Sequence, residues 1–322
     1  MIFQYVILLT IELITLVKAS DVFVDAASSL AAHLRVPKML VALTVAAFGT
    51  CAPELAISFK SMATGNYDMT LANVIESSVV NILLVVGIAS IVSPISVKEQ
   101  TVKNELPILA AITLTFFVSL NDTVFGAAIN GLSRIDAIIL MIMFAFFLLY
   151  IFVTVHFDKN HQRRKHHRRR QAKYTLGRSI LYIVITLLLI ALASDIAVDN
   201  AAYLAEELRI SQKIISMTII VIGTSLPELI MTVNASKKGE HDLAVGNIIG
   251  TNIFNICIVL GLPTLIFGGF TSAVFNIIDT LVVLFAAIMY YLCSRSSKKL
   301  TRVEGIMMVM VFAAYYTYVL TP

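Results

Sequence analysis

Long apolar stretches follow one another along almost the whole chain, separated by short polar segments. Each is close to the length of about 20 residues that a helix needs to cross the roughly 30 Å of hydrocarbon in a bilayer. About ten such stretches can be distinguished by this criterion, with approximate limits at 2–18, 37–63, 70–92, 105–121, 135–156, 178–196, 211–236, 243–267, 271–293 and 303–320. The pattern predicts an all-α, polytopic membrane protein with ten transmembrane helices.

The composition agrees with this prediction. Of the 322 residues, 58% are hydrophobic and only 14% are charged, whereas a soluble domain is about 45–50% apolar. The first stretch lacks a basic amino-terminal region and a small-residue cleavage site, so it is predicted to be a retained span and not a signal peptide. Cys51, Cys257 and Cys293 lie within or at the end of apolar stretches, which favours buried thiols over disulfides.

Basic residues are concentrated in the segments that ten spans would place on one side of the membrane. These segments hold about twenty of the 24 Lys and Arg residues, and the positive-inside rule therefore predicts that this side is cytoplasmic and both termini lie outside. The segment 156–178, "HFDKNHQRRKHHRRRQAKYTLGR", is expected to orient the protein and to contact anionic lipid headgroups. A regulatory metal site and nucleic-acid contact were the alternatives, but the segment has no regular metal-ligand spacing.

Two parts of the chain repeat one another at a constant offset of 174 residues, as from Glu54 to Glu228 and from Asn81 to Asn255. The matching stretches are "ASDVFVDAASSLAAHLR" with "ASDIAVDNAAYLAEELR", "GTCAPEL" with "GTSLPEL", and "ANVIESSVVNI" with "GNIIGTNIFNI". Shared apolar composition does not explain matching Asp, Gly, Thr, Pro, Glu and Asn in register. The chain is therefore predicted to consist of two five-helix repeats, residues 1–155 and 178–322, joined by a basic linker at 156–177.

An odd number of spans in each half makes the second half enter the membrane in the opposite direction. This inverted repeat is the architecture of many secondary transporters, whose substrate site lies between the halves at broken helices. Pro53 and Pro227 predict those breaks, because each proline lacks an N–H and clashes with the carbonyl four residues earlier, at Gly49 or Gly223. Irregular backbone at this depth is tolerated only where it faces protein or a water-filled cavity.

Glu54 and Glu228 lie near the middle of their spans, where an ionised side chain costs on the order of 3 kcal/mol. No Lys or Arg stands within about a turn of either residue, so a bound cation or protons are the candidate counter-charges. Neighbouring groups with neutral oxygens are Thr50, Thr224, Ser225, Ser77, Asn81, Thr251 and Asn255. Carboxylates with neutral oxygens suit a hard cation such as calcium. Any one hydroxyl alone could equally serve helix packing, but matched sets in both halves favour an ion site.

At these residues the chain resembles the cation/calcium antiporter superfamily, in its sodium/calcium exchanger branch. The stretches "FGTCAPEL" with "GNYDMTLANVIESSVVNILLVVG", and "IGTSLPEL" with "GEHDLAVGNIIGTNIFNICIVLG", look like that family's two alpha-repeats. The resemblance covers nearly the whole chain. It implies ten helices, of which the first and sixth slide over a rigid core to alternate access. The central loop is too short for a cytosolic calcium-sensing domain, so regulation by such a domain is not expected.

The resemblance also implies roles for individual residues. Glu54 and Glu228 would be the central calcium ligands, and Asn81 with Asn255 would complete the middle of the cluster. The flanking sodium sites would be built by Thr50, Thr224, Ser225, Ser77 and Thr251 with the carbonyls of Ala47 and Val221. Cys51 is a departure, because it stands where the other half has Ser225 and a thiol is a poor sodium ligand.

The first repeat departs further from the family pattern. Ala72, Glu76 and Ser78 stand where the second half keeps Gly246, Gly250 and Asn252. We hypothesise that Glu76 is a proton-sensitive modulator beside the site, the alternative being a tolerated polar substitution lining a cavity. Glu12, in the first stretch, is a further intramembrane carboxylate, and its counterpart in the second half is Thr186.

The leading hypothesis is a secondary antiporter that exchanges calcium for sodium by alternating access. The runner-up keeps the fold and couples calcium to protons, since Glu12 and Glu76 are extra carboxylates; a cation channel is the hypothesis from another class. An enzyme is not expected, because no nucleophile and base pair stands near the cluster. No cofactor, nucleic acid or obligate protein partner is expected, only the two transported ions and the bilayer, in the inner membrane of a prokaryote.

Overall fold

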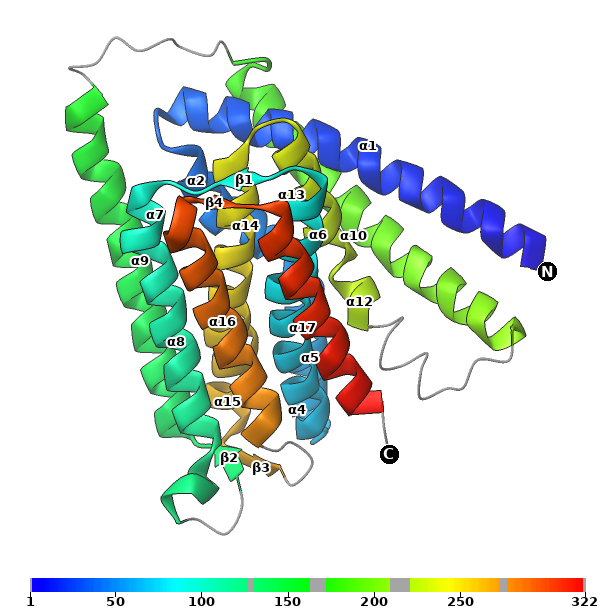
Figure 1. Cartoon of the computed structure of the whole chain (residues 1–322), viewed down its shortest axis with the longest axis vertical. Coiled ribbons are helices and arrows are strands. Elements are labelled where there is room, and N and C mark those ends of the chain that lie inside the picture. Colours follow the sequence, from blue (N-terminus) through cyan, green and yellow to red (C-terminus); the bar gives the residue numbers. More distant parts are fainter. Residues whose placement is uncertain (1, 127–129, 163–171, 209–220, 273–276, 321–322) are drawn as a thin grey trace.

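Helices coincide with the apolar stretches of the chain in the computed structural model, which describes residues 2–126, 130–162, 172–208, 221–272 and 277–320 (Figure 1). The elements of the first half are α1 (Ile2–Leu34), α2 (Lys38–Val41), the π-helix η1 (Ala42–Ala46), α3 (Ala47–Thr50), α4 (Ala52–Ala63), α5 (Tyr67–Val79), the π-helix η2 (Val80–Val85), α6 (Val86–Val92), β1 (Ile95–Ser96), α7 (Glu99–Lys103), α8 (Glu105–Leu120), the 3-10 helix η3 (Asp122–Phe125), β2 (Asn130–Leu132) and α9 (Arg134–Gln162).

The second half follows the same order. Its elements are α10 (Leu176–Glu207), α12 (Val221–Thr224), α13 (Leu226–Lys237), α14 (His241–Phe254), the π-helix η5 (Asn255–Leu260), α15 (Gly261–Phe267), β3 (Phe270–Ser272), α16 (Ile277–Ser297), β4 (Lys299–Leu300) and α17 (Arg302–Leu320). The middle of the basic segment, residues 163–171, and the start of the seventh predicted span, residues 211–220, lie outside the described residues.

The prediction of an all-α, polytopic membrane protein is confirmed. Each of the ten predicted stretches coincides with helix, the seventh from Val221 onward. Within the described residues, six helices are long and apolar enough to cross a membrane, and the bent pair Lys38–Thr50 with Ala52–Ala63 would make a seventh. The count of ten spans stays a prediction.

Two helices stand apart from the others. Most helices run along the long axis of the molecule, whereas α1 and α10 lie obliquely against one end, and the N-terminus and the end of α10 project away from the bundle (Figure 1). The buried apolar side chains divide in the same way. One cluster fills the bundle, and a second joins α1 and α10 to residues of the broken helices and of α14. The α1–α10 pair thus forms a layer that packs on the bundle through this second apolar cluster.

Short antiparallel strands join the two halves at both ends of the bundle. Strand β1 pairs with β4 at one end, with Ile95 opposite Leu300, and β2 pairs with β3 at the other, with Gly131 opposite Thr271. Each pair takes one strand from each half of the chain. The two halves are therefore linked by backbone hydrogen bonds as well as by the shared core.

Glycines let α14 approach the first broken helix closely. A Cβ on Gly246 would lie 2.7 Å from the Cβ of Ala42, and one on Gly250 would lie 2.8 Å from the Cβ of Ala47 and 2.9 Å from the backbone of Leu43. Real Cβ atoms do not approach backbone this closely, so only glycine fits at Gly250 without moving the helices. These contacts bring the second half against η1 and α3 of the first.

Candidate cation site

Two broken helices, 174 positions apart in the chain, form the framework of the site. Cys51 separates α3 from α4, with φ −83° and ψ 1°, and the two helix segments meet at 48°. Ser225 separates α12 from α13 with nearly the same angles, φ −91° and ψ 7°. The carboxylates Glu54 and Glu228 lie in the first turn of α4 and α13, where the positive end of the helix dipole favours negative charge.

The prolines act at the breaks as the sequence predicts. Pro53 and Pro227 occupy the first turns of α4 and α13, where a residue without an N–H is tolerated because that donor would have no partner within the helix. The carbonyl of Gly223, which the sequence marks as freed, accepts a hydrogen bond from Ser194 Oγ at 3.0 Å. The break at Pro227 therefore does not leave this oxygen unpaired.

The neighbouring helices contribute the amides through local π-helical turns. The turn η2 contains Asn81 and the turn η5 begins at Asn255, so both asparagines lie where the regular α-helix is interrupted. Such π-turns are rare in proteins overall. Those that occur are often found at functional sites, because the extra residue redirects side chains. Ser77 and Thr251 lie one turn before them, on α5 and α14.

The side chains that the sequence singles out are buried together at the breaks. Glu54 is 1% exposed and Glu228 is 0% exposed. Charges on both of them act on the thiol of Cys51, and the charge of Glu228 acts on Glu54. The other buried members are Thr50, Ser77, Asn81, Ser225, Thr251, Asn255, Cys51 and Ala47. Thr224 is partly exposed.

Most oxygens of this cluster have no hydrogen-bond partner within the described part of the chain. They are Glu54 Oε2, both carboxylate oxygens of Glu228, Asn81 Oδ1, Ser225 Oγ, Thr251 Oγ1 and Asn255 Oδ1. A buried polar atom without a partner costs roughly 1–3 kcal/mol, more when it is charged, so seven together indicate a group that binds them. No ion pair of the described residues reaches either glutamate.

The donor set fits a hard cation. Two carboxylates, hydroxyls and amide oxygens are the ligands of calcium and of other hard ions. Within the described ranges, no group of three His, Cys, Asp or Glu side chains is placed to hold a metal ion. A site for a hard cation at this place therefore depends on two carboxylates supported by neutral oxygens.

The carbonyls of Ala47 and Val221 were predicted as sodium ligands, and the structure describes the surroundings of the first more fully than those of the second. The carbonyl of Ala47 already accepts hydrogen bonds from Cys51 N at 3.1 Å and from Thr50 Oγ1 at 3.3 Å. Thr50 also donates to the carbonyl of Ala46 at 3.2 Å. Val221 begins α12, and its side chain is outside the described part of the molecule. The sodium-site roles of Ala47 and Val221 stay predictions.

Two positioning residues and one charge were missed by the sequence reasoning. Asn73 Nδ2 donates to the carbonyl of Glu54 at 3.0 Å, and its repeat counterpart Asn247 donates to Thr232 Oγ1 at 3.3 Å. Both fix a broken helix to the helix that follows. The available signal was their identity in both halves of the repeat. Asp195 of α10 acts electrostatically on Glu54, and the repeated "ASD" of α1 and α10 was its signal.

The two other unusual carboxylates lie away from the cluster's centre. Glu76 is largely buried and interacts electrostatically with Asp279 of α16 and with the hydroxyl of Tyr316 of α17. Glu12 accepts a hydrogen bond from Asn200 Nδ2 at 2.7 Å, between α1 and α10. Glu76 therefore faces the outer helices, and Glu12 belongs to the oblique pair.

Comparison with known proteins finds similarity to membrane exchangers and antiporters along nearly the whole chain. A model of the family described as sodium/calcium exchanger protein matches residues 4–153 and 178–321. The chain is 34% identical over 314 residues to the putative antiporter CaxA of Alkalimonas amylolytica, with 96% of each chain covered. It is also 34% identical over 306 residues to the inner membrane protein YrbG of Escherichia coli, covering 94% of this chain and 92% of that protein.

A named exchanger and solved structures extend the comparison. The sodium/calcium exchanger MaX1 of Methanosarcina acetivorans is 27% identical over 337 residues, with 96% of each chain covered. A structure of the sodium-calcium exchanger NCX_Mj superposes with a TM-score of 0.82 at 28% identity, covering 98% of this chain and 99% of that one. Similarity thus extends over both broken helices and over the basic linker's two flanks.

Proposed function

We propose that this chain, which belongs to the sodium/calcium exchanger protein family, is a secondary antiporter that exchanges calcium for sodium by alternating access. The family establishes an exchanger and an integral membrane protein. The coupling ion is our proposal. The observation that supports it is the set of seven buried oxygens, three of them from Glu54 and Glu228, that have no partner within the described residues. This set suits hard cations and offers no soft ligand except Cys51.

In this proposal Glu54 and Glu228 coordinate the calcium ion from opposite broken helices. Asn81 and Asn255 close the middle of the cluster with neutral amide oxygens, so that the two carboxylates supply its whole charge. One divalent ion or two monovalent ions neutralise them, and this equivalence allows calcium and sodium to compete for one site. Sodium would occupy flanking positions at Thr50, Thr224, Ser77, Thr251 and Ser225, with carbonyls of Ala47 and Val221.

The two repeats supply equal parts of the site. Residues 1–155 and 178–322 would each contribute one broken helix and one π-turn helix, and the basic segment 156–177 would connect them in the cytoplasm. Both termini would lie outside. Relatives from bacteria and archaea, one of them named an inner membrane protein, support a prokaryotic inner membrane, with anionic lipid headgroups against the basic segment.

Calcium flux in proteoliposomes tests the proposal. Liposomes loaded with sodium should take up external calcium, and replacement of internal sodium by choline should abolish the uptake. Calcium uptake that persists without sodium and follows an imposed proton gradient would replace sodium by the proton as coupling ion, the role for which the carboxylates Glu12 and Glu76 are available. Flux without any counter-ion would indicate a channel.

A further inference from the structure

The oblique helix α1 is attached to the bundle much more firmly than its repeat counterpart α10. Hydrogen bonds and ion pairs join α1 to α13 and to the turn after it. Asn234 Nδ2 donates to the carbonyl of Val17 at 3.0 Å, Ser20 Oγ donates to the carbonyl of Ile230 at 3.4 Å, and Lys238 Nζ forms ion pairs with Asp21 and Asp25 at 2.8 and 2.7 Å. These contacts follow one edge of α1 for two turns.

The repeat predicts the same contacts between α10 and α4, but they are missing. Within the described residues, no hydrogen bond or ion pair joins α10 to α4. The counterparts of Asp21 and Asp25 are Asp195 and Asp199, and both are exposed without an ion pair in the described structure. Where the second half has Lys238, the first half has Thr64. The two ends of the molecule therefore differ at positions where the two repeats have diverged.

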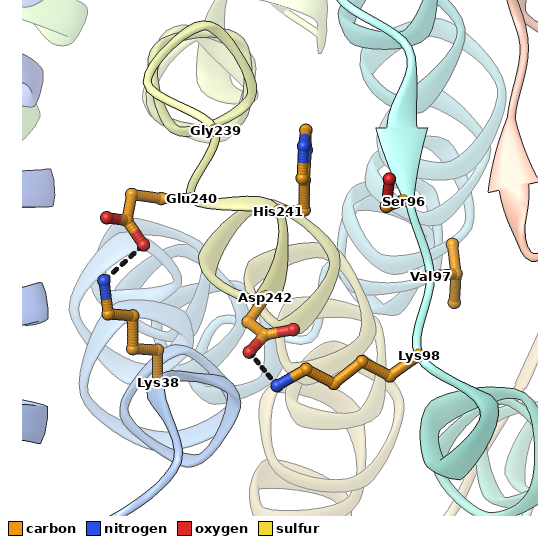
Figure 2. A pocket seen from close by; sticks show the side chains of 8 residues that line it. All are labelled: Lys38, Ser96, Val97, Lys98, Gly239, Glu240, His241 and Asp242. Carbon is orange, nitrogen blue, oxygen red and sulfur yellow. Dashed lines mark hydrogen bonds and ion pairs between the residues drawn. The ribbon is translucent and has the colours of Figure 1, made fainter. Parts of the chain in front are cut away.

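The turn between α13 and α14 is the centre of the ion pairs at the end of the molecule where α1 is attached to the bundle. Besides Lys238, this turn carries Glu240, which pairs with Lys38 of α2 at 2.5 Å. Asp242, in the first turn of α14, pairs with Lys98 before α7. Both pairs are drawn in Figure 2, and all four of these side chains line, with His241, a pocket of about 340 Å³. Residues 238–242 thus hold α1, α2 and the segment leading to α7. The corresponding turn of the first half has Asn66 where this one has Glu240.

A further pair strengthens the attachment at the basic segment. Lys173, which precedes α10, forms an ion pair with Asp25 at 2.5 Å, and this carboxylate raises the pKa of the Lys173 amine. Asp25 is thereby shared by two lysines from outside α1. All these pairs lie at the end of the bundle where α2, β1 and β4 meet, which we call the basic face (Figure 1).

We propose that the segment of residues 238–242 is a latch that closes the route from the basic face to the cation site. The ammonium group of Lys238 forms ion pairs with Asp21 and Asp25 of α1. These ion pairs must break before α1 can move away from α13. Because the described residues of α10 and α4 form no equivalent latch, the protein at rest favours the state closed on the basic face and open on the other. The inference rests on the proposed alternating-access function, and it adds an asymmetry that the repeat does not contain.

The thiol of Cys51 provides a direct measure of this route. Cys51 is 0% exposed and lies at the hinge of the first broken helix. A reagent added at the basic face can therefore reach its thiol only when the route from that face to the cation site is open. Replacing Cys257 and Cys293 by alanine leaves it as the one thiol, since the chain has three cysteines. A membrane-impermeant cationic methanethiosulfonate is then added from the basic face in oriented membrane vesicles.

Lys238→Met should raise the rate of Cys51 labelling from the basic face by about fivefold, the range expected when partly exposed ion pairs are lost. The matched control is Lys237→Met, which removes the same charge one position earlier from an exposed side chain with no ion pair in the described structure. That variant should label at the parental rate, and Lys238→Arg should stay close to it. Equal labelling of the Lys238→Met and Lys237→Met variants would overturn the latch.

Removal of the partner carboxylate gives a second, independent variant. Asp25→Asn should also accelerate labelling. The double variant with Lys238→Met should label faster than either single variant, but its fold-increase in rate should be smaller than the product of the two single fold-increases. Multiplicative effects would contradict a shared latch. Thermal unfolding of every variant in detergent checks the fold. Because labelling needs neither sodium nor calcium, failure of the latch is distinguishable from failure of the exchange function, which only the flux measurement reports.

Discussion

Cys51 and Ser225 are the hinge residues of two helices broken in the same way, and only Ser225 offers a hydroxyl to the site. Both are fully buried, at 0% and 1% exposure, and their backbone angles differ by less than ten degrees. Nothing in the backbone therefore separates the two halves at this point. The difference between them is one of ligand chemistry, since sulfur is a poor donor to a hard ion.

Cys51→Ser should strengthen the flanking site. The sodium concentration that gives half-maximal calcium exchange should fall by about threefold, a gain on the scale of one hydrogen bond. Sodium-dependent calcium efflux from proteoliposomes measures it. Cys257→Ser, at another fully buried cysteine, is the matched control and should leave this concentration unchanged. An unchanged sodium dependence in Cys51→Ser would exclude residue 51 as a ligand position.

The two glutamates should be indispensable. Glu54→Gln or Glu228→Gln keeps the size of the side chain and removes the charge that a cation requires, so calcium uptake should fall to the background of empty liposomes. The variants should remain folded, because the change relieves an unpaired buried carboxylate. Thermal unfolding and size-exclusion chromatography check this. Near-normal exchange by either folded variant would refute the site.

Charge balance leads to a prediction about voltage. Calcium or two sodium ions neutralise Glu54 and Glu228, and the amides of Asn81 and Asn255 add no charge, so exchange against more than two sodium ions moves net positive charge with sodium. Calcium uptake against internal sodium should then accelerate when the liposome interior is made positive. Each elementary charge is worth about 2.3 kcal/mol per 100 mV. Uptake indifferent to a potassium diffusion potential would indicate an electroneutral cycle.

Close packing at Gly250 should make it intolerant of any side chain. Gly250→Ala places a Cβ 2.9 Å from the backbone of Leu43, so α14 must shift from the broken helix at a cost of about 1–3 kcal/mol. Lower thermal stability and lower calcium uptake are both expected. Gly177→Ala, where a Cβ would meet nothing within 4 Å, is the control and should change neither. Equal stability of the two variants would contradict the packing argument.

Glu76 stands where the second half has this glycine, and its role as a modulator stays a hypothesis. Its neighbours Asp279, Tyr315 and Tyr316 come from α16 and α17, and Tyr315 Oη donates to Asp279 at 3.2 Å. If Glu76 modulates transport, Glu76→Gln should flatten the pH profile of calcium exchange while exchange itself persists. Superimposable profiles of the variant and the parent would identify Glu76 as a tolerated polar substitution.

The helices and the burial of the candidate site residues were predictable from local sequence, whereas the ion-binding roles of these residues stay predictions. Pro53 and Pro227 mark the breaks because the effect of proline on a helix is local, and Glu54 with Glu228 stand out because a charge in an apolar stretch needs a partner. The repeat, however, predicts equal surroundings for α1 and α10. Their different contacts with α13 and α4 involve Lys238, which has Thr64 as its counterpart, and which carboxylates this lysine reaches depends on the packing of helices far apart in the chain.

The pairing of β1 with β4 and of β2 with β3 has a consequence for how the protein can be assembled. Each strand pair takes one partner from each half, so the halves recognise each other through backbone hydrogen bonds at both ends as well as through apolar packing. A covalent connection between them adds little to this specificity. Two separately synthesised polypeptides, divided within residues 163–171, should therefore associate in the membrane into a working exchanger, and the gene can be treated as two complementing fragments.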